Sequence, residues 1–154
     1  MSRIKKILLA LLLAFIAIQF IQPARNKSGQ VLPADISKMY AMPQNVESIF
    51  QKACYDCHTN NTNYPWYVSV QPMGWVMAKH IRDGKAEINF SEFGNYSGRR
   101  QISKLKNITN SIKDGTMPLP SYTWLHADAK LTANEKAAIT SWITKTKDSL
   151  ENKK

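Results

Sequence analysis

The sequence predicts an all-α domain, and three observations support this fold class. Apolar residues recur at helical spacing in several windows, and Val46, Ile49 and Phe50 open the first of them. Signals that start and stop helices flank these windows. No window has a convincing strand pattern, and no internal repeat is visible. The chain has 154 residues, which suits one domain that buries a hydrophobic core of its own.

The N-terminal segment, residues 1–22, reads MSRIKKILLALLLAFIAIQFIQ. Basic residues, among them Lys5 and Lys6, precede an unbroken apolar run over residues 7–18. This pattern is typical of an export signal or a membrane anchor. No A-x-A-like cleavage site follows, which favours an uncleaved signal-anchor over a cleaved signal peptide. Under the positive-inside rule the lysines stay in the cytoplasm and the rest of the chain lies outside it.

Residues 23–44 are predicted to be a linker that tethers the following domain to the membrane surface. Polar residues in this segment are interrupted by Pro23, Gly29, Pro33 and Pro43. The domain itself is predicted over residues 45–148. A short polar tail, residues 149–154, follows it.

The first helix of the domain is predicted from Asn45. Its apolar positions fall at i, i+3, i+4 and i+7, one face of a helix, and are Val46, Ile49, Phe50 and Ala53. This helix delivers the segment Cys54–His58 at its C-terminal end. The next stretch, TNNTNYPWYVSVQP, is rich in turn formers and is predicted to be a loop that folds back on the core.

Two further helices are predicted in the middle of the chain. One runs from about Met73 to Asp83 and is stopped by Gly84. Residues 85–98 are predicted to be irregular, with Phe90 and Phe93 as anchors. A helix from about Arg99 to Asp114 follows, and Gly115 suits its C′ position. The apolar stripe of that helix comprises Ile102, Leu105, Ile108 and Ile112.

The segment TMPLPSYTWLH is predicted to be extended, because Pro118 and Pro120 break helices and restrict the residue before them. The last helix is predicted to start with a capping box, in which Thr132 is the N-cap and Glu135 is N3. One face of this helix carries Ile139, Trp142, Ile143 and Thr146.

The formal net charge is +10. A basic chain favours an acidic partner, an anionic membrane surface or nucleic acid. No RNA-binding, zinc-finger or basic-zipper pattern is present, so nucleic acid is not an expected partner.

The only two cysteines, Cys54 and Cys57, stand three residues apart and are followed at once by His58. A disulfide between them would close a very short loop and stabilise little. A thioredoxin-like dithiol would follow a strand, whereas this pair ends a helix. A zinc site would need His80 or His126 as a fourth ligand, and adjacent ligands at Cys57 and His58 are awkward for tetrahedral closure.

Covalent haem requires this arrangement of residues. Thioether bonds to the two vinyl groups need cysteines about one helical turn apart, and C-x-x-C-H is the attachment signature of c-type haem. We therefore expect Cys54 and Cys57 to hold one haem c and His58 to bind its iron from the proximal side. An export segment fits this interpretation, because haem is attached outside the cytoplasm.

A second axial ligand is needed if the iron is six-coordinate. The candidates are Met39, Met42, Met73, Met77, Met117, His80 and His126. Met117 is favoured because it follows a helix and a glycine in a stiff segment between helix-breaking prolines. Met73 and Met77 suit core packing. His80, near the end of its helix, remains the alternative ligand, because the aromatic insert before it leaves room for it to approach the iron.

The motifs Cys54-x-x-Cys57-His58 and Gly115-x-Met117-Pro118, with Trp142 on the terminal helix, resemble class I cytochrome c. Residues 45–145 are also similar to a small haem-binding domain family of bacterial exported proteins. The resemblance implies a cytochrome c-like helical fold, thioether bonds at both cysteines, His58 as proximal ligand and Met117 as distal ligand.

One-electron transfer in a periplasmic redox chain is the function that these expectations favour, with unidentified redox proteins as partners. His/Met ligation leaves no open iron site, and a thioether ligand raises the reduction potential. The domain would lie on the periplasmic side of the inner membrane. The alternative is a haem-based sensor or a peroxidase-like enzyme with a labile or open distal site.

Overall fold

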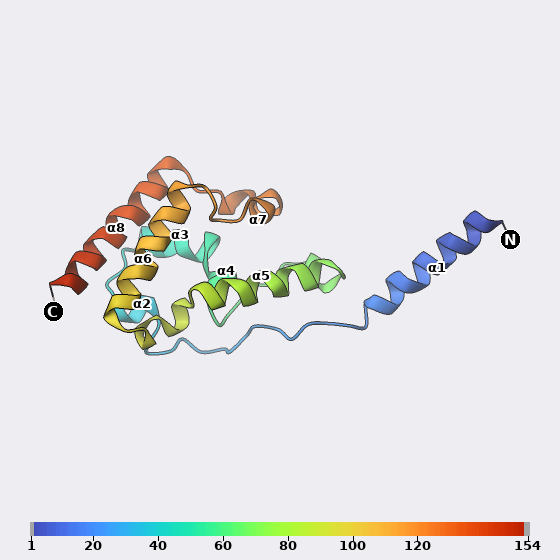
Figure 1. The fold of residues 1–154 in the computed structure, drawn as a ribbon, viewed down its shortest axis with the longest axis horizontal. Helices are drawn as coiled ribbons and strands as arrows, with labels where there is room; N and C mark the ends of the chain where they lie inside the picture. The colour runs from blue at the N-terminus through green and yellow to red at the C-terminus, as the bar shows by residue number, and fades with distance from the viewer. Residues whose placement is uncertain (1, 153–154) are drawn as a thin grey trace.

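The computed structural model describes residues 2–152, and within them it contains helices and no strand, which confirms the all-α prediction (Figure 1). One isolated bridge joins Lys27 to Asn61. Three short 3₁₀ helices, η1 (Trp66–Ser69), η2 (Phe90–Asn95) and η3 (Ala127–Ala129), lie between the longer elements. The α-helices are α1 (Arg3–Ile18), α2 (Ile36–Met39), α3 (Gln44–Ala53), α4 (Tyr55–His58), α5 (Met73–Glu87), α6 (Gly98–Lys113), α7 (Pro120–Leu125) and α8 (Ala133–Glu151).

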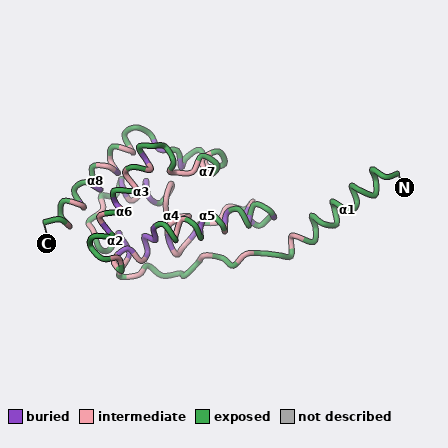
Figure 2. Tube along the Cα trace, viewed as in Figure 1, coloured by how far each residue is buried: buried purple, intermediate pink, exposed green. Residues whose placement is uncertain are grey.

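The main core lies where α3, α6 and α8 pack against η2, and Figure 2 shows the buried segments gathered there. Phe50 is fully buried, and its ring meets those of Phe90 and Trp142 edge-on, with centroids 5.3 and 5.6 Å apart. The predicted stripe of α8 is buried along its length, and the predicted capping box between Thr132 and Glu135 is present. These outcomes confirm the apolar periodicity and the start of the last helix.

Two predicted boundaries are wrong, each for a physical reason. Helix α5 does not stop at Gly84 but continues to Glu87, because Gly84 packs against a neighbouring segment instead of turning the chain. Pro120 does not keep its segment extended. It is the first residue of α7, a position where its missing N–H costs nothing.

The segment before α3 is bound to the domain over much of its length. Ile36 in α2 is fully buried in the main core. The Trp142 indole donates to the carbonyl of Ala41 at 3.0 Å. Farther back, the Asn26 side-chain amide donates to the Thr59 carbonyl at 2.8 Å. Parts of the segment predicted as a linker therefore contribute to the folded body.

Helix α1 lies apart from the rest of the molecule, and none of its residues is buried (Figures 1 and 2). Among the helices within residues 2–152, none combines the length and the apolar character needed to cross a membrane. The predicted signal-anchor helix therefore finds no support in the structure. Directly after α1, the Gln19 side chain accepts a hydrogen bond from the backbone N–H of Gln71 at 2.8 Å.

Candidate functional site

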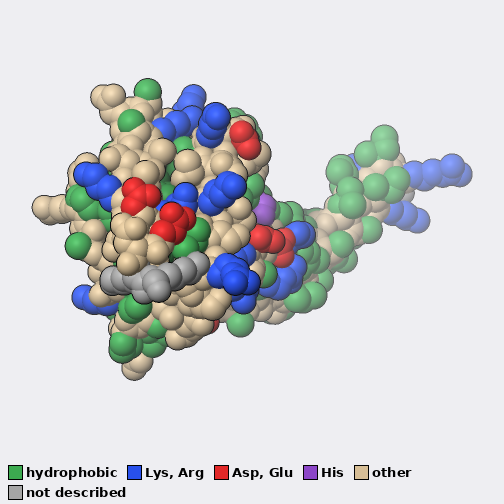
Figure 3. All heavy atoms as spheres, turned by 60° about the vertical axis from the view of Figure 1, so that its left-hand side comes forward, with side chains coloured by type: hydrophobic (Ala, Val, Ile, Leu, Met, Phe, Trp, Pro, Cys, Tyr) green, Lys and Arg blue, Asp and Glu red, His purple; other side chains and the backbone are tan. Residues whose placement is uncertain are grey.

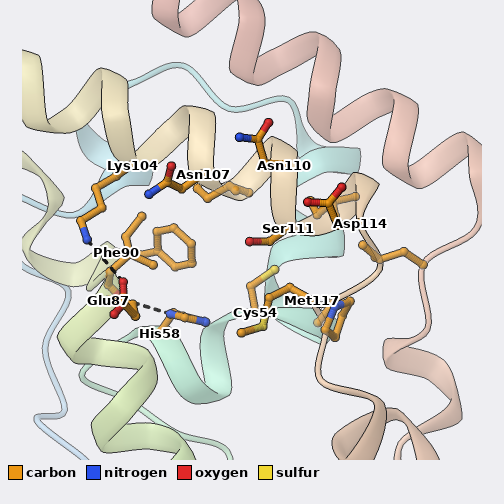
Figure 4. A pocket seen from close by; sticks show the side chains of 16 residues that line it. Cys54, His58, Glu87, Phe90, Lys104, Asn107, Asn110, Ser111, Asp114 and Met117 are labelled. Carbon is orange, nitrogen blue, oxygen red and sulfur yellow. Dashed lines mark hydrogen bonds and ion pairs between the residues drawn. The ribbon is translucent and has the colours of Figure 1, made fainter.

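A cavity of about 280 Å³ opens between α4, α6 and the loop that leads into α7. Cys54, His58 and Met117 lie along one side of it, and polar side chains of α6 lie along the other (Figure 4). The remaining walls are largely apolar, and they include Ala53, Ile88, Phe90, Ile108, Ile112, Pro118 and Leu131. The cavity therefore combines apolar walls with the sulfur and nitrogen groups singled out in the sequence.

The two cysteines occupy a break between two helices. Cys54 ends α3 with a non-helical backbone (φ −130°, ψ −42°), and α4 begins at the next residue. Cys57 lies in α4 and lines a smaller adjoining cavity, which Cys54 and Met117 also line. Both cysteines are free. Burial raises the pKa of Cys54 to about 12 and that of Cys57 to about 11, so both remain thiols at neutral pH.

His58 is fixed through one ring nitrogen. Its Nδ1 lies 2.9 Å from the carbonyl oxygen of Gly84 and 3.1 Å from that of Ile88, so Nδ1 carries the proton and donates. The other nitrogen, Nε2, then keeps its lone pair and is the atom available to a metal. Burial lowers the pKa of His58, although the two carbonyls oppose this shift, and the neutral form that binds metals is favoured.

Gly84 explains how α5 approaches His58 so closely. A Cβ at this position would lie 2.9 Å from the carbonyl oxygen of Cys57 and 3.3 Å from the His58 ring. Only a glycine therefore allows α5 to pack against α4 and place the Gly84 and Ile88 carbonyls beside Nδ1. We predicted Gly84 to stop the helix. The residues after it, Lys85 to Glu87, favour a helix, and this was the sequence signal that α5 continues past Gly84.

Met117 is positioned by the C-terminus of α6. Gly115 adopts the left-handed conformation (φ +70°) predicted for it. The Thr116 N–H donates to the Ser111 carbonyl at 3.0 Å and the Gly115 N–H donates to the Ile112 carbonyl at 3.3 Å, which is the Schellman pattern. The Met117 N–H also donates to Ser111, at 3.2 Å. Backbone bonds therefore hold the loop from which the Met117 side chain reaches the cavity.

The other candidate iron ligands lie elsewhere. His80, Met73 and Met77 line a separate cavity of about 230 Å³ beside α7. His126 Nε2 is 2.6 Å from the hydroxyl of Tyr67 in η1, and the His126 ring stacks on that of Tyr122 in α7. The cavity that contains Cys54 and His58 is thus lined by Met117 and not by His80. The assignment of Met117 as distal ligand stays a prediction, and it is the one that this arrangement favours.

The side chains give no support to a zinc site. Within residues 2–152, no group of three or more His, Cys, Asp or Glu side chains is arranged to hold a metal ion. A zinc site built on Cys54, Cys57 and His58 would need such a group. Haem iron needs only two axial protein ligands, because the porphyrin supplies the other four.

Comparison with protein families gives a match that covers most of the chain. The model of the haem-binding domain family matches residues 13–145. The chain belongs to the haem-binding domain family. Comparison with curated proteins and with solved structures found no match, so the resemblance to class I cytochrome c stays a prediction.

Haem suits the residues of this haem-binding domain. A porphyrin needs apolar cover on its faces and polar partners for its two carboxylates, and the cavity offers both. Helix α6 presents Lys104, Asn107 and Ser111 to it at i, i+3 and i+7, a polar stripe at helical spacing beside the predicted apolar one. Lys104 Nζ lies 3.8 Å from a Glu87 carboxylate oxygen at the cavity edge. We did not predict these residues, although their spacing was visible in the sequence.

A second unpredicted contact joins the segment between the two cysteines to α7. Asp56, between the cysteines, accepts a hydrogen bond from the Tyr122 hydroxyl of α7 at 2.8 Å. The same carboxylate accepts from the backbone N–H of Asn63 at 2.9 Å. Burial, followed by the bond to Asp56, raises the pKa of Tyr122 far above its usual value. Tyr122 therefore remains a hydrogen-bond donor and ties the C-x-x-C-H segment to the helix that follows Met117.

Proposed function

We propose that this cavity holds one haem c and that the domain carries single electrons. The observation that carries the proposal is that Cys54, His58 and Met117 line one largely apolar cavity. Membership of the haem-binding domain family supports the cofactor. The C-x-x-C-H spacing supports covalent attachment.

The two cysteines would attach the group without any oxidation or reduction. Each cysteine would hold the haem through a thioether bond to one vinyl group, and the addition of S–H to the double bond balances without an oxidant or a reductant. The raised pKa values of Cys54 and Cys57 keep both residues as thiols until then. Neither cysteine is consumed by a disulfide, since both are free.

His58 and Met117 would bind the haem iron. The Gly84 and Ile88 carbonyls orient the His58 ring and make Nε2 a better electron donor. The Met117 thioether, a soft ligand, favours the ferrous state and raises the potential. Bound in this way, the haem supplies reversible one-electron transfer, and no axial position is left open for oxygen or peroxide.

Lys104 and Asn107 would bind the haem carboxylates. Lys104 brings a positive charge to the lining of the cavity, and its side chain is only 17% exposed. A cation in a partly buried site is stabilised by an incoming carboxylate, and Asn107 adds an amide donor. The propionate groups therefore have partners on α6, opposite the cysteines.

The location and the partners follow from the export-type N-terminus. We place the domain on the periplasmic side of the inner membrane, either anchored or released by cleavage after the signal. Redox proteins with acidic docking surfaces suit its net charge of +10.

Mass spectrometry of the mature protein under denaturing conditions tests the proposal. The expected result is the polypeptide mass plus one haem, and the same spectrum gives the mature N-terminus. The Cys54→Ala, Cys57→Ala double variant should lose the added mass completely. Met117→Ala is the matched control and should keep it, because that residue makes no covalent bond. A wild-type protein that carries zinc and no covalent haem would refute the proposal.

A further inference from the structure

An exposed apolar surface lies at the end of the domain nearest α1. It is formed by η1, the N-terminal half of α5, and α7, and we call it the tryptophan face. Trp66 and Trp124 are 82% and 85% exposed, whereas Trp142 in the core is 5% exposed. Four of its residues line a common cavity with Tyr67, and Trp66 contacts Tyr67. The tryptophan face comprises Trp66, Met73, Trp75, Val76, Trp124 and Leu125.

The segments that build this end of the molecule contain no acidic residue. The chain has 11 Asp and Glu residues, and none of them falls in residues 1–34, 57–82 or 115–127. The same three segments contain Arg3, Lys5, Lys6, Arg25, Lys27, Lys79 and Arg82. The last two are paired with Asp83, which directly follows Arg82 in α5. By contrast, the face seen from the α8 end mixes acidic and basic side chains (Figure 3).

The chain leaving α1 is hydrogen-bonded to the segments beside this face. The Trp75 indole donates to the carbonyl of Ile21 at 2.8 Å, and the Gln71 side-chain amide donates to Gln22 at 2.9 Å. Helix α1 itself exposes large apolar side chains and buries none of its residues. The apolar helix and the tryptophan face therefore lie at the same end of the molecule, and the face itself contains no acidic residue.

We propose that the tryptophan face rests on the surface of a membrane that contains anionic lipid. Tryptophan is the side chain best suited to the headgroup region, because its ring is apolar and its N–H is polar. Basic residues of α1 and of the segment that follows it, Arg3, Lys5, Lys6, Arg25 and Lys27, add attraction to anionic headgroups. Continuity with α1 brings the face to the bilayer whether that helix enters it or lies along it.

This contact would fix the orientation of the domain. The tryptophan face meets the lipid, and α8, at the other end of the molecule, points away from it (Figure 1). The proposal does not use the haem chemistry, so the failure of either one leaves the other intact.

Photolabelling from the lipid tests this contact in the full chain. The protein is bound to vesicles of phosphatidylglycerol and phosphatidylcholine in equal parts, doped with a diazirine-bearing lipid, and labelled sites are mapped by mass spectrometry. Labels are expected on the peptides that carry Trp66, Trp75 and Trp124, in addition to α1. Labelling that is confined to α1, or as frequent on α8 as on the tryptophan face, would overturn the proposal.

Two variants separate the face from the helix. Trp66→Ser with Trp124→Ser should lower labelling of α5 and α7 several-fold and leave labelling of α1 in place. The matched control, Val31→Ser with Met39→Ser, changes exposed apolar residues outside the face and should change nothing. Equal labelling of α5 and α7 in both double variants contradicts the proposal. So does a dimer, formed without vesicles, that the Trp66→Ser, Trp124→Ser variant abolishes, because a second copy would then cover the face.

Discussion

His58 and Met117 line the same cavity, yet the chain holds them by different means. His58 depends on tertiary packing: α5 presses against α4 at Gly84, and two carbonyls of the α5 end bind Nδ1. Met117 depends on local structure, since the backbone bonds of its loop all return to the last turns of α6. The His58 side of the cavity should therefore be sensitive to packing changes, whereas the Met117 side should tolerate side-chain changes without loss of the fold.

Gly84→Val should have the largest effect, because it disrupts the packing of α5 on α4 that holds His58. The new Cβ would lie 2.9 Å from a Cys57 backbone oxygen, so α4 and α5 must separate. Overpacking of this kind costs about 3 kcal/mol. We expect that loss in the free energy of unfolding in urea, together with altered visible spectra of the bound haem.

Gly98→Val is the control for this change. Gly98 begins α6, and a Cβ there meets nothing within 4 Å. Its free energy of unfolding should stay within about 0.5 kcal/mol of the wild type. If both valine variants are equally stable, the close contact at Gly84 does not hold His58 in place.

Met117→Ala removes the thioether side chain that lines the cavity and leaves its loop intact. The ferric protein should lose the weak near-infrared band that marks sulfur bound to iron, and the ferrous protein should bind carbon monoxide. Stability should fall by about 2 kcal/mol or less, because Met117 is only half-buried. An unchanged band would mean that another methionine, such as Met77, is the sulfur ligand, whereas a wild-type protein without the band would point to His80 as the sixth ligand. The His80→Ala variant, expected to be spectrally silent, distinguishes the two.

Tyr122→Phe tests the contact between α7 and the segment between the two cysteines. It removes the hydrogen bond from Tyr122 to the Asp56 carboxylate, which is worth about 1.5 kcal/mol when one partner is charged. Chemical denaturation should show that loss, while the visible spectrum changes little. Asp56→Asn with Tyr122→Phe should cost less than the sum of the two single changes. Additive costs would show that the two side chains do not interact in solution.

Glu135→Gln should have the smallest effect, because it removes one partly exposed ion pair, with Lys52. The bond from Lys52 is the main reason that the pKa of Glu135 is lowered. A carboxylate with a lowered pKa stabilises the fold above its unfolded pKa of about 4.5, and this stabilisation is lost as the pH falls through the folded value.

The difference in stability between wild type and Glu135→Gln should therefore be constant near neutrality and shrink below about pH 4.5. Its size near pH 7 should be about 0.5 kcal/mol, as for other exposed ion pairs. Urea midpoints measured from pH 7 to pH 3 provide the test. A difference that grows on acidification would contradict the sign of the pKa shift.

Local signals in the sequence predicted much of the fold. The stripe of α8, its Thr132 cap and the Gly115 turn depend on residues a few positions apart, and all are present. Gly84 was misjudged because its role is set by α4, far away in the sequence. The same holds for the Tyr122–Asp56 bond, since 66 positions separate its partners. Spacing could predict the C-x-x-C-H site, whereas the supports of His58 follow only from the packing.

The segment that connects α1 to the domain is held against the domain by hydrogen bonds. Gln19, next after α1, is bonded to Gln71, and farther along Asn26 is bonded to the loop that follows His58. A flexible chain of this length, residues 19–26, would have a variable end-to-end distance of about 1.5 nm. Here the domain has hardly any reach of its own. Helix α1 and the domain should therefore move together, so that any surface bound by α1 holds the domain close to it.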